Sequence, residues 1–280
     1  MKITMRHLLI PFLLAATLAT AAHAAPLPRP DHVVVVIEEN RGYEQIMDRL
    51  KKDSYIHALA KRGMLLTQSY GVTHPSQPNY LALFSGSTQG CTDDYCPLNL
   101  KGDNLATALI DNGLSFNSYS ESLPAAGDAS CMSGGYQRKH NPVVNWQDTR
   151  LTGSVNLRFS DFPQDFSRLP TVSFVIPNQQ NDMHDGSFFM ADEWLKVHIE
   201  PYVKWAFSHN SLLILTWDED NGTEGNHVAT ILVGPMVKQG RSNQHVDHYT
   251  VLRTLLDFYG VPAPNASRDA APINNIWNKR

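Results

Sequence analysis

The feature that most constrains the fold of this 280-residue chain is a set of short, uninterrupted apolar runs rich in β-branched residues. The clearest of them cover residues 32–37, 171–176, 212–217 and 228–233. Strands that are buried on both faces have this continuous pattern, whereas strands with one exposed face alternate apolar and polar residues. The runs therefore predict a central β-sheet that is covered on both sides.

Segments with helical periodicity separate these runs. We predict one helix over 43–62, with an interruption near Asp53, and a second helix directly after the loop that holds Ser76. Three more helices are predicted over 105–110, 189–207 and 249–259. Further strands are predicted over 64–70 and 115–119. This alternation predicts an α/β fold with a mostly parallel central sheet and helices on both faces. In such sheets, ligand sites lie at the carboxyl ends of the strands. The segment 121–156 shows no such period, and an irregular stretch of this length is more often functional than decorative.

The first 24 residues are predicted to be a signal peptide. A positively charged start is followed by an apolar run over 8–18 and by Ala22-His23-Ala24, which fits the small-residue rule for cleavage. The run is shorter than the roughly 20 residues that span a membrane, so we expect no integral membrane segment after cleavage. We therefore expect the protein to be exported to the periplasm or the medium. The rest of the chain, residues 25–280, is expected to form a single domain.

Composition supports a globular domain and argues against one class of partner. A hydrophobic content of 42% in 280 residues is enough to form a substantial core. The formal charge is −4, and the 23 Lys and Arg residues are scattered along the chain. Because no basic stretch stands out, we expect no nucleic-acid partner.

The three cysteines, Cys91, Cys96 and Cys131, lie in the loop-rich second quarter of the chain. In an exported protein they predict one disulfide and one odd thiol, and all three pairings are open. A zinc site is the alternative interpretation, but no fourth ligand has the spacing that zinc motifs require.

Acidic and amide side chains follow two of the predicted strands. Glu39 and Asn40 follow the first run, and Asp218 and Glu219 follow the third. A parallel sheet could place these strand ends side by side, and close carboxylates repel one another unless a cation joins them. Oxygen ligands suit a hard divalent ion such as Mg²⁺, Ca²⁺ or Mn²⁺. Either pair alone would be read as ordinary turn residues, so the metal site is predicted only if the two strand ends meet.

Ser76 lies between two prolines in the segment 73–80. A serine in this setting usually forms a turn. Here a helix is predicted to follow, and the amides and dipole at its N-terminus would favour an anionic group beside Ser76, to which Asn79 could also donate. No GxSxG elbow or phosphate-binding P-loop is present, which argues against a serine esterase. We therefore take Ser76 as the candidate nucleophile.

Three of the twelve histidines are candidates for the same site. His140 precedes Asn141-Pro142, His184 lies between Asp182 and Asp185, and His227 precedes the fourth apolar run. An imidazole can donate a proton to a leaving oxygen or a hydrogen bond to a phosphoryl oxygen.

Five short motifs, taken in order, resemble the bacterial phosphoesterase family. They cover residues 38–41, 74–80, 139–142, 182–186 and 217–219. This family holds secreted acid phosphatases and nonspecific phospholipases C, and it belongs to the alkaline phosphatase superfamily. The resemblance extends from about Asp31 to the last predicted helix, and it implies an alkaline phosphatase-like fold.

The resemblance also implies roles for individual residues. Ser76 corresponds to the phosphorylated nucleophile. The ligands of a single divalent metal, to which the serine oxygen also binds, correspond to Glu39, Asn40, Asp218 and Glu219. Positions that line the phosphate pocket correspond to His140, Asp182 and His184. Asn79 resembles the phosphate-contacting asparagine of related nucleotide phosphodiesterases, and His227 is carried over as a pocket residue.

These correspondences lead to an expected activity. We expect an exported, metal-dependent acid phosphatase that hydrolyses small phosphate monoesters through a phosphoserine, with phospholipids and phosphoinositides among the candidate substrates. His184 or His140 would donate a proton to the leaving group, which favours mildly acid pH. One alternative is a phosphodiesterase of phospholipase C type, although those relatives carry insertions and C-terminal additions that this chain lacks. The other is a catalytically inactive anion-binding domain, against which the intact Ser76 and its acidic neighbours argue.

Overall fold

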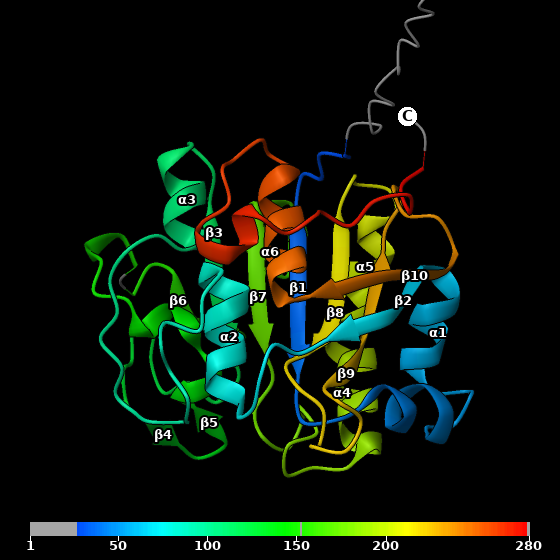
Figure 1. Ribbon diagram of the computed structural model, residues 1–280, viewed down its shortest axis with the longest axis horizontal. Coiled ribbons are helices and arrows are strands. Elements are labelled where there is room, and N and C mark those ends of the chain that lie inside the picture. The colour runs from blue at the N-terminus through cyan, green and yellow to red at the C-terminus, as the bar shows by residue number, and fades with distance from the viewer. Residues whose placement is uncertain (1–26, 152, 279–280) are drawn as a thin grey trace, which may run out of the picture.

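The computed structural model describes residues 27–151 and 153–278, so the predicted signal peptide lies outside the described residues. An eight-stranded sheet forms the centre of the molecule, in the order β10-β2-β9-β8-β1-β7-β3-β6. Helices pack on both faces of this sheet (Figure 1). The predicted α/β class is confirmed.

All of the predicted apolar runs form strands of this sheet. Its strands are β1 (Val33–Glu38), β2 (Met64–Tyr70), β3 (Phe116–Ser120), β6 (Asn156–Arg158), β7 (Val172–Ile176), β8 (Leu212–Trp217), β9 (His227–Val233) and β10 (Gly240–Asp247). Only β9 runs antiparallel to its neighbours, β2 and β8. A separate hairpin consists of β4 (Met132–Ser133) and β5 (Tyr136–Gln137). The edge strand β10 was not predicted, because its polar sequence lacks the signal of a buried strand.

The helices agree with the prediction except that one of them is divided in two. They are α1 (Tyr55–Arg62), α2 (Ser76–Ser85), α3 (Leu105–Asp111), α4 (Phe188–His198), α5 (Glu200–Ala206) and α6 (His248–Asp257). A π-helical turn, Gln45–Arg49, precedes α1, and Ser54 caps α1, which confirms the interruption near Asp53. The predicted helix over 189–207 is divided, because Pro201 has no N–H to continue the hydrogen bonding of α4. Short 3₁₀ turns cover Arg138–His140, Pro142–Asn145, Thr149–Leu151, Phe159–Asp161, Phe166–Arg168 and Asn265–Arg268.

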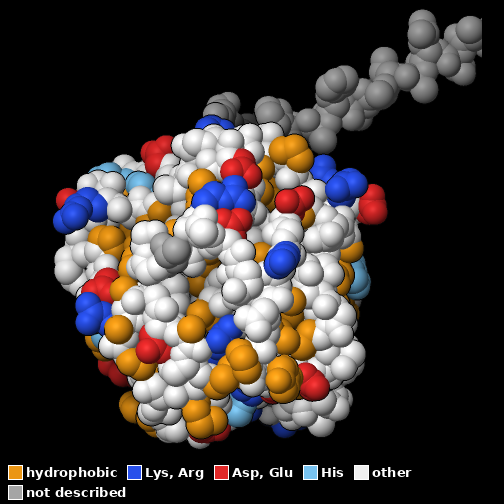
Figure 2. All heavy atoms as spheres, turned by 90° about the vertical axis from the view of Figure 1, so that its left-hand side faces the viewer, with side chains coloured by type: hydrophobic (Ala, Val, Ile, Leu, Met, Phe, Trp, Pro, Cys, Tyr) orange, Lys and Arg blue, Asp and Glu red, His pale blue; other side chains and the backbone are white. Residues whose placement is uncertain are grey.

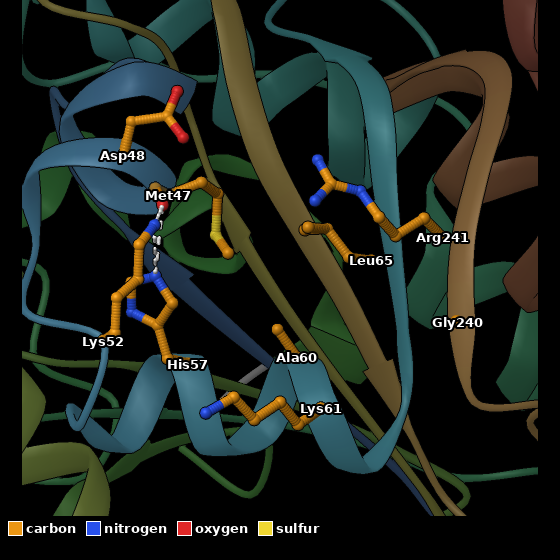
Figure 3. A pocket seen from close by; sticks show the side chains of 9 residues that line it. All are labelled: Met47, Asp48, Lys52, His57, Ala60, Lys61, Leu65, Gly240 and Arg241. Carbon is orange, nitrogen blue, oxygen red and sulfur yellow. Dashed lines mark hydrogen bonds between the residues drawn. The ribbon is translucent and has the colours of Figure 1, made fainter.

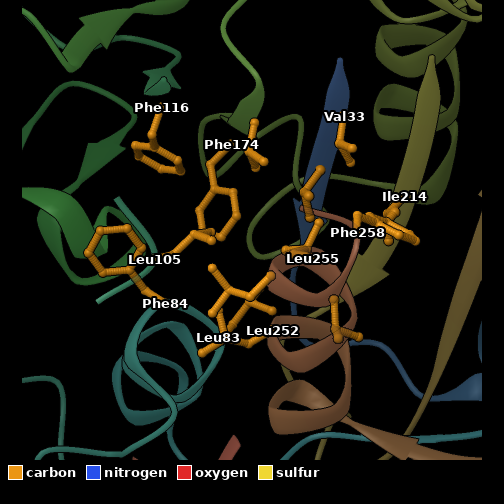
Figure 4. Packing of buried hydrophobic residues seen from close by; sticks show 14 of the residues in the cluster. Val33, Leu83, Phe84, Leu105, Phe116, Phe174, Ile214, Leu252, Leu255 and Phe258 are labelled. Atoms are coloured by element: carbon orange, nitrogen blue, oxygen red, sulfur yellow. The ribbon is translucent and has the colours of Figure 1, made fainter. Parts of the chain in front are cut away.

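The two faces of β1 belong to two separate cores. Val33 and Val35 pack in the core that includes α2, α3 and α6, and Val34 and Val36 pack in the core with α1, α4 and α5. In the first core Phe84 of α2 contacts Phe174 of the sheet edge-on, with 6.0 Å between ring centroids (Figure 4). This packing holds α2 against the sheet and thereby fixes the position of its first residue, Ser76.

A disulfide joins Cys96 to Cys131 and leaves Cys91 as a free thiol. Of the three pairings that the sequence left open, this one links two loops 35 residues apart. The bond uses two of the three thiols that a zinc site would need.

Among the described residues, no helix combines the length and the apolar character needed to cross a bilayer.

Candidate active site

The site forms where β1 and β8 end beside the N-terminus of α2. These strands are parallel neighbours, with Glu38 opposite Trp217, so Glu39 and Asp218 leave the sheet at the same level. The hydroxyl oxygen of Ser76 lies 3.0 Å from Glu39 Oε2 and 2.9 Å from Glu219 Oε1. The two acidic strand ends therefore meet beside Ser76, which is the condition on which the metal prediction depended.

Asp218 and Asn40 complete this corner of the site in different ways. Asp218 Oδ1 accepts a hydrogen bond of 3.2 Å from the backbone N–H of Asn40, and Asp218 Oδ2 is buried without a hydrogen-bond partner. Asn40 thus contacts the cluster through its backbone, which has a positive φ of 52° at this residue. No side-chain hydrogen bond from Asn40 to the cluster is found among the described residues.

The electrostatics of the cluster suit a bound cation. Burial and the neighbouring Asp218 and Asp182 carboxylates raise the pKa of Glu39 well above its usual value. Burial, followed by repulsion from Glu219, raises the pKa of Asp218 in the same way. A divalent cation would offset this repulsion and supply a partner for the unpaired Asp218 oxygen. The carboxylates and the serine hydroxyl are ligands that Mg²⁺, Ca²⁺ and Mn²⁺ prefer.

A second group of possible ligands shares one residue with this cluster. Ligand atoms of Glu39, His140 and His184 lie within 4.8 Å of one another. Imidazole nitrogens suit transition metals better than Mg²⁺ or Ca²⁺. The geometry therefore supports a cation beside Glu39 without selecting its identity.

His140 is buried inside the site beside Glu39. Its Nε2 lies 3.2 Å from Glu39 Oε1, although the two atoms are not aligned as a hydrogen bond, and its ring stacks on Tyr80. Burial, reinforced by the positive charge of Lys139, lowers the pKa of His140 well below its usual value. This shift disfavours the charged imidazole that would donate a proton to a leaving group.

Asp182 and His184 are close neighbours of His140. Asp182 Oδ1 accepts a hydrogen bond of 2.8 Å from the backbone N–H of His184, and Asp182 Oδ2 lies 3.6 Å from His140 Nδ1. Burial raises the pKa of Asp182 to about 7. The imidazole of His184 is partly exposed and pairs with Asp185 at 2.8 Å. Of the two predicted proton donors, His184 is thus the one that solvent reaches.

Asn79 lies at the site, but its side chain is occupied by the protein. Its Oδ1 accepts hydrogen bonds from the backbone N–H groups of Val72 and Thr73. Its Nδ2 donates to the carbonyls of Thr73 and Pro75 and reaches Glu219 Oε2 at 3.4 Å. Through these contacts Asn79 supports the loop before Ser76. The sequence had instead predicted that Asn79 contacts the substrate.

His227 is placed away from this cluster. Its ring is stacked between Tyr43 and Tyr70, with centroid distances of 4.5 Å and 5.0 Å. Its Nε2 lies 3.0 Å from the carbonyl oxygen of Thr67. The structure therefore brings together the predicted site residues other than His227.

Four further residues contact the site and were not singled out from the sequence. His74 bridges Glu219 and the next residue, Asp220, at 2.6 Å and 3.1 Å. Tyr80 donates a hydrogen bond of 2.6 Å to Glu39 Oε1. Lys139 forms an ion pair of 2.9 Å with Asp94, whose other oxygen accepts from the backbone N–H of Gln77. His74, Tyr80 and Lys139 lie inside the motifs already quoted, whereas Asp94 carries no sequence signal of its own.

A surface pocket of about 330 Å³ lies elsewhere, between α1, the π-helical turn and the starts of β2 and β10 (Figure 3). It is lined by Met47, Asp48, Lys52, His57, Ala60, Lys61, Leu65, Gly240 and Arg241. None of these residues belongs to the cluster around Ser76. The pocket is near the beginning of β2, whereas the Ser76 loop follows the end of that strand.

Comparisons with known proteins identify the family of this chain. A model of the phosphoesterase family matches residues 50–262. A phosphatidylinositol-3-phosphatase of Mycobacterium tuberculosis is 45% identical over 255 residues, which cover 91% of this chain and 85% of that protein. A probable acid phosphatase of Kluyveromyces lactis is 32% identical over 250 residues, which cover 81% of this chain and 58% of that protein. The chain thus spans little more than half the length of this fungal relative.

Solved structures add evidence on the fold. A protein of the alkaline phosphatase superfamily from Vibrio parahaemolyticus superposes with a TM-score of 0.57 at 13% identity, over 85% of this chain and 68% of that one. At this identity the likeness shows the fold alone. Together with the family match over more than half of the chain, it shows that this protein belongs to the phosphoesterase family and has the fold of the alkaline phosphatase superfamily.

Proposed function

We propose that this protein is a metal-dependent phosphatase that hydrolyses phosphate monoesters through a phosphoserine at Ser76. The observation that carries the proposal is the Ser76 hydroxyl, which lies within 3.0 Å of carboxylates from two different strand ends. Its relatives in Mycobacterium tuberculosis and Kluyveromyces lactis are named as phosphatases, which supports the same class of reaction.

The residues around Ser76 can prepare it for attack. Its hydroxyl proton faces Glu39 Oε2 and Glu219 Oε1, so the proton can leave without a rearrangement of the side chain. His74 and Asn79 hold Glu219 in place from the other side. A divalent cation held by Glu39, Asp218 and Glu219 would lower the pKa of the Ser76 hydroxyl and offset negative charge on the phosphoryl group.

Two displacements complete the reaction. In the first, the Ser76 oxygen forms a bond to phosphorus, the bond from phosphorus to the ester oxygen breaks, and the leaving oxygen takes a proton from His184. In the second, water forms a bond to phosphorus and gives a proton to His184, the Ser76–phosphorus bond breaks, the Ser76 oxygen takes back the proton held by its carboxylate neighbours, and inorganic phosphate leaves. In this proposal Lys139 would supply a positive charge to the phosphoryl oxygens, and an N–H of His140 would donate a hydrogen bond to them.

The proposed substrates are small phosphate esters, and phosphoinositides are included because of the activity named for the mycobacterial relative. We further propose a single domain over 25–280 that is exported to the periplasm or the medium after removal of residues 1–24. The Cys96–Cys131 disulfide is compatible with an oxidising compartment.

Ser76→Ala tests the proposal directly. We expect it to abolish hydrolysis of a soluble chromogenic phosphate monoester, and we expect acid quenching to trap a phosphoserine in the parent enzyme but not in the variant. Ser85→Ala is the matched control, because Ser85 lies on the same helix and, among the described residues, its hydroxyl bonds only within α2 and the turn that follows. Substantial activity in Ser76→Ala would exclude this residue as the nucleophile, and turnover of diesters alone would exclude a monoesterase.

A further inference from the structure

The surface pocket beside α1 is lined by more positive than negative side chains. Lys52, Lys61 and Arg241 line it together with a single carboxylate, that of Asp48. The whole chain, in contrast, carries a formal charge of −4. Figure 2 views the molecule from the side opposite to α1, and there several of the scattered Lys and Arg side chains lie next to Asp or Glu. The pocket is therefore a local reversal of charge.

The contacts of these basic side chains leave their charge without a counterion. In the part of the chain that the structure describes, the ion pairs of Lys and Arg all involve other residues. Lys52 Nζ donates to the carbonyl oxygen of Met47 and lies 3.5 Å from His57 Nε2. Arg241 donates to the hydroxyl of Tyr43 and has four further N–H groups. Positive groups around one cavity repel one another, and a bound anion would offset that repulsion.

The charged groups reach the pocket from different elements. Arg241 extends from β10 toward the π-helical turn, whereas Lys52 and His57 lie on the opposite side of the space (Figure 3). Lys61 comes from α1. The volume of about 330 Å³ is within the range of small-molecule sites, about 300–1,000 Å³. Cationic groups can therefore contact one small molecule from more than one side.

The rest of the lining is mostly apolar. Met47 and Leu65 are 7% and 3% exposed, and Ala60 of α1 also lines the pocket. An inorganic anion would leave this apolar surface in contact with water, whereas an organic group attached to the anion would cover it. The lining includes no hydroxyl or thiol side chain, so it offers no Ser, Thr or Cys nucleophile. These features favour a binding site over a second catalytic site.

We propose that this pocket binds a small phosphorylated organic molecule. Its phosphoryl group lies among the three basic side chains, and its organic part lies against the apolar lining. A phosphate dianion has three oxygens that can accept hydrogen bonds from a guanidinium and two ammonium groups at the same time. A single carboxylate carries one charge and would offset the positive excess only in part. The site is separate from the cluster around Ser76, so binding here goes beyond the proposed hydrolysis.

Lysine acetylation with and without a ligand tests the proposal at individual residues. The ligand is phenylphosphonate, in which a carbon–phosphorus bond replaces the ester bond that a phosphatase cleaves. We expect it to protect Lys52 and Lys61 of the intact protein from an amine-reactive acetylating reagent, measured by peptide mass spectrometry. Lys51 and Lys101 serve as controls, because they are exposed and do not line the pocket. Lys139 reports separately on binding at the candidate active site.

Two variants test the contribution of the positive charges. Arg241→Gln removes one charge and keeps both reporter lysines, and we expect the concentration for half-protection of Lys52 and Lys61 to rise at least about tenfold. Arg168→Gln is the matched control at an exposed arginine outside the lining and should equal the parent. Lys61→Gln, measured at Lys52, should give a loss of similar size. This second variant separates the lost charge from any effect of the Arg241–Tyr43 hydrogen bond.

Inorganic phosphate tests the organic part of the ligand. We expect half-protection by phosphate to need a concentration at least about tenfold higher, because phosphate has no ring to cover the apolar lining. Equal concentrations for the two probes would overturn the assignment of an organic ligand. Protection of Lys52 and Lys61 no greater than that of Lys51 and Lys101 would overturn the site. Acetylation does not depend on turnover, so this result is independent of whether the protein hydrolyses phosphate esters.

Discussion

At the scale of single residues, the site depends on side chains that hold the reactive groups in place. Asn79 uses both ends of its amide to hold residues 72–75 and also reaches Glu219. Ser76 is the first residue of α2, so this loop sets the position of its hydroxyl. Residues of this kind act on the reaction through their neighbours.

We expect Asn79→Ala to lower kcat by about 10- to 100-fold, as is typical for the loss of a supporting hydrogen bond at a metal site. The loop before Ser76 would lose its amide partners, and Glu219 would lose one of its constraints. The change should also weaken activation by Mg²⁺ or Mn²⁺, measured as a titration of activity. Asn117→Ala serves as the control, since Asn117 lies on β3 away from the cluster. If only KM rose while kcat and metal activation stayed normal, Asn79 would be a substrate contact instead.

Lys139 offers a separate test of substrate binding. Its side chain is only 16% exposed and lies between Asp94 and His184. We expect Lys139→Ala to raise KM for a phosphate monoester at least about fivefold, because a cation near the phosphoryl group is lost, and Lys139→Arg to restore part of it. Lys204→Ala, on the exposed face of α5, should leave steady-state kinetics unchanged. An unaltered KM in Lys139→Ala would argue against a phosphate contact.

At the scale of elements, two features position the site. The parallel pairing of β1 with β8 sets Glu39 beside Asp218, and the packing of α2 through Phe84 sets Ser76 against both. The Cys96–Cys131 disulfide restrains the loops that carry Asp94 and Lys139. The irregular segment 121–156 is thus tied covalently to the loop that carries Asp94.

The disulfide should also contribute to stability. It closes a loop with a sequence separation of 35 residues. We expect the double substitution Cys96→Ser with Cys131→Ser to lower the free energy of unfolding by about 2–4 kcal/mol, because the unfolded chain regains conformational freedom. Urea unfolding of the oxidised parent and the variant measures this difference. Cys91→Ser is the control and should match the parent, whereas equal stability of all three proteins would show that the bond does not stabilise the fold.

At the scale of the whole molecule, the sheet brings together groups that repel one another. The pKa values of Glu39, Asp218 and Glu219 are all raised, chiefly by burial. Protons and a cation therefore compete for the same carboxylate oxygens, and cation binding releases protons. The site should consequently hold a metal less tightly as the pH falls.

We expect the concentration of Mg²⁺ or Mn²⁺ that gives half-maximal activity to decrease as the pH rises from about 5 to about 7.5. Activity after exhaustive chelation, followed by titration with each ion at each pH, measures this. Asp218→Asn should raise the required concentration at every pH and reduce its dependence on pH. Full activity in the chelated enzyme would remove the metal from the proposal, and a concentration that does not change with pH would contradict the competition.

Much of the fold and the centre of the site could be predicted from the sequence. The apolar runs determined the strands and the burial of both sheet faces, because periodicity and burial are local properties of a segment. The acidic strand ends and Ser76 were recognisable from the motifs around them. The polar edge strand β10 was not, since a strand at the edge of a sheet needs no continuous apolar run.

Only the tertiary structure decided which side chains meet. The sequence by itself left three cysteine pairings open, and it predicted Asn79 as a substrate contact and His227 as a pocket residue. In the structure Cys96 pairs with Cys131, the side-chain amide of Asn79 forms hydrogen bonds with backbone groups, and His227 stacks between two tyrosines. The physical reason is that such contacts depend on strand register and loop paths between distant residues. Ser76 and Glu219 are 143 residues apart in the chain, and only the folded sheet places them 2.9 Å apart.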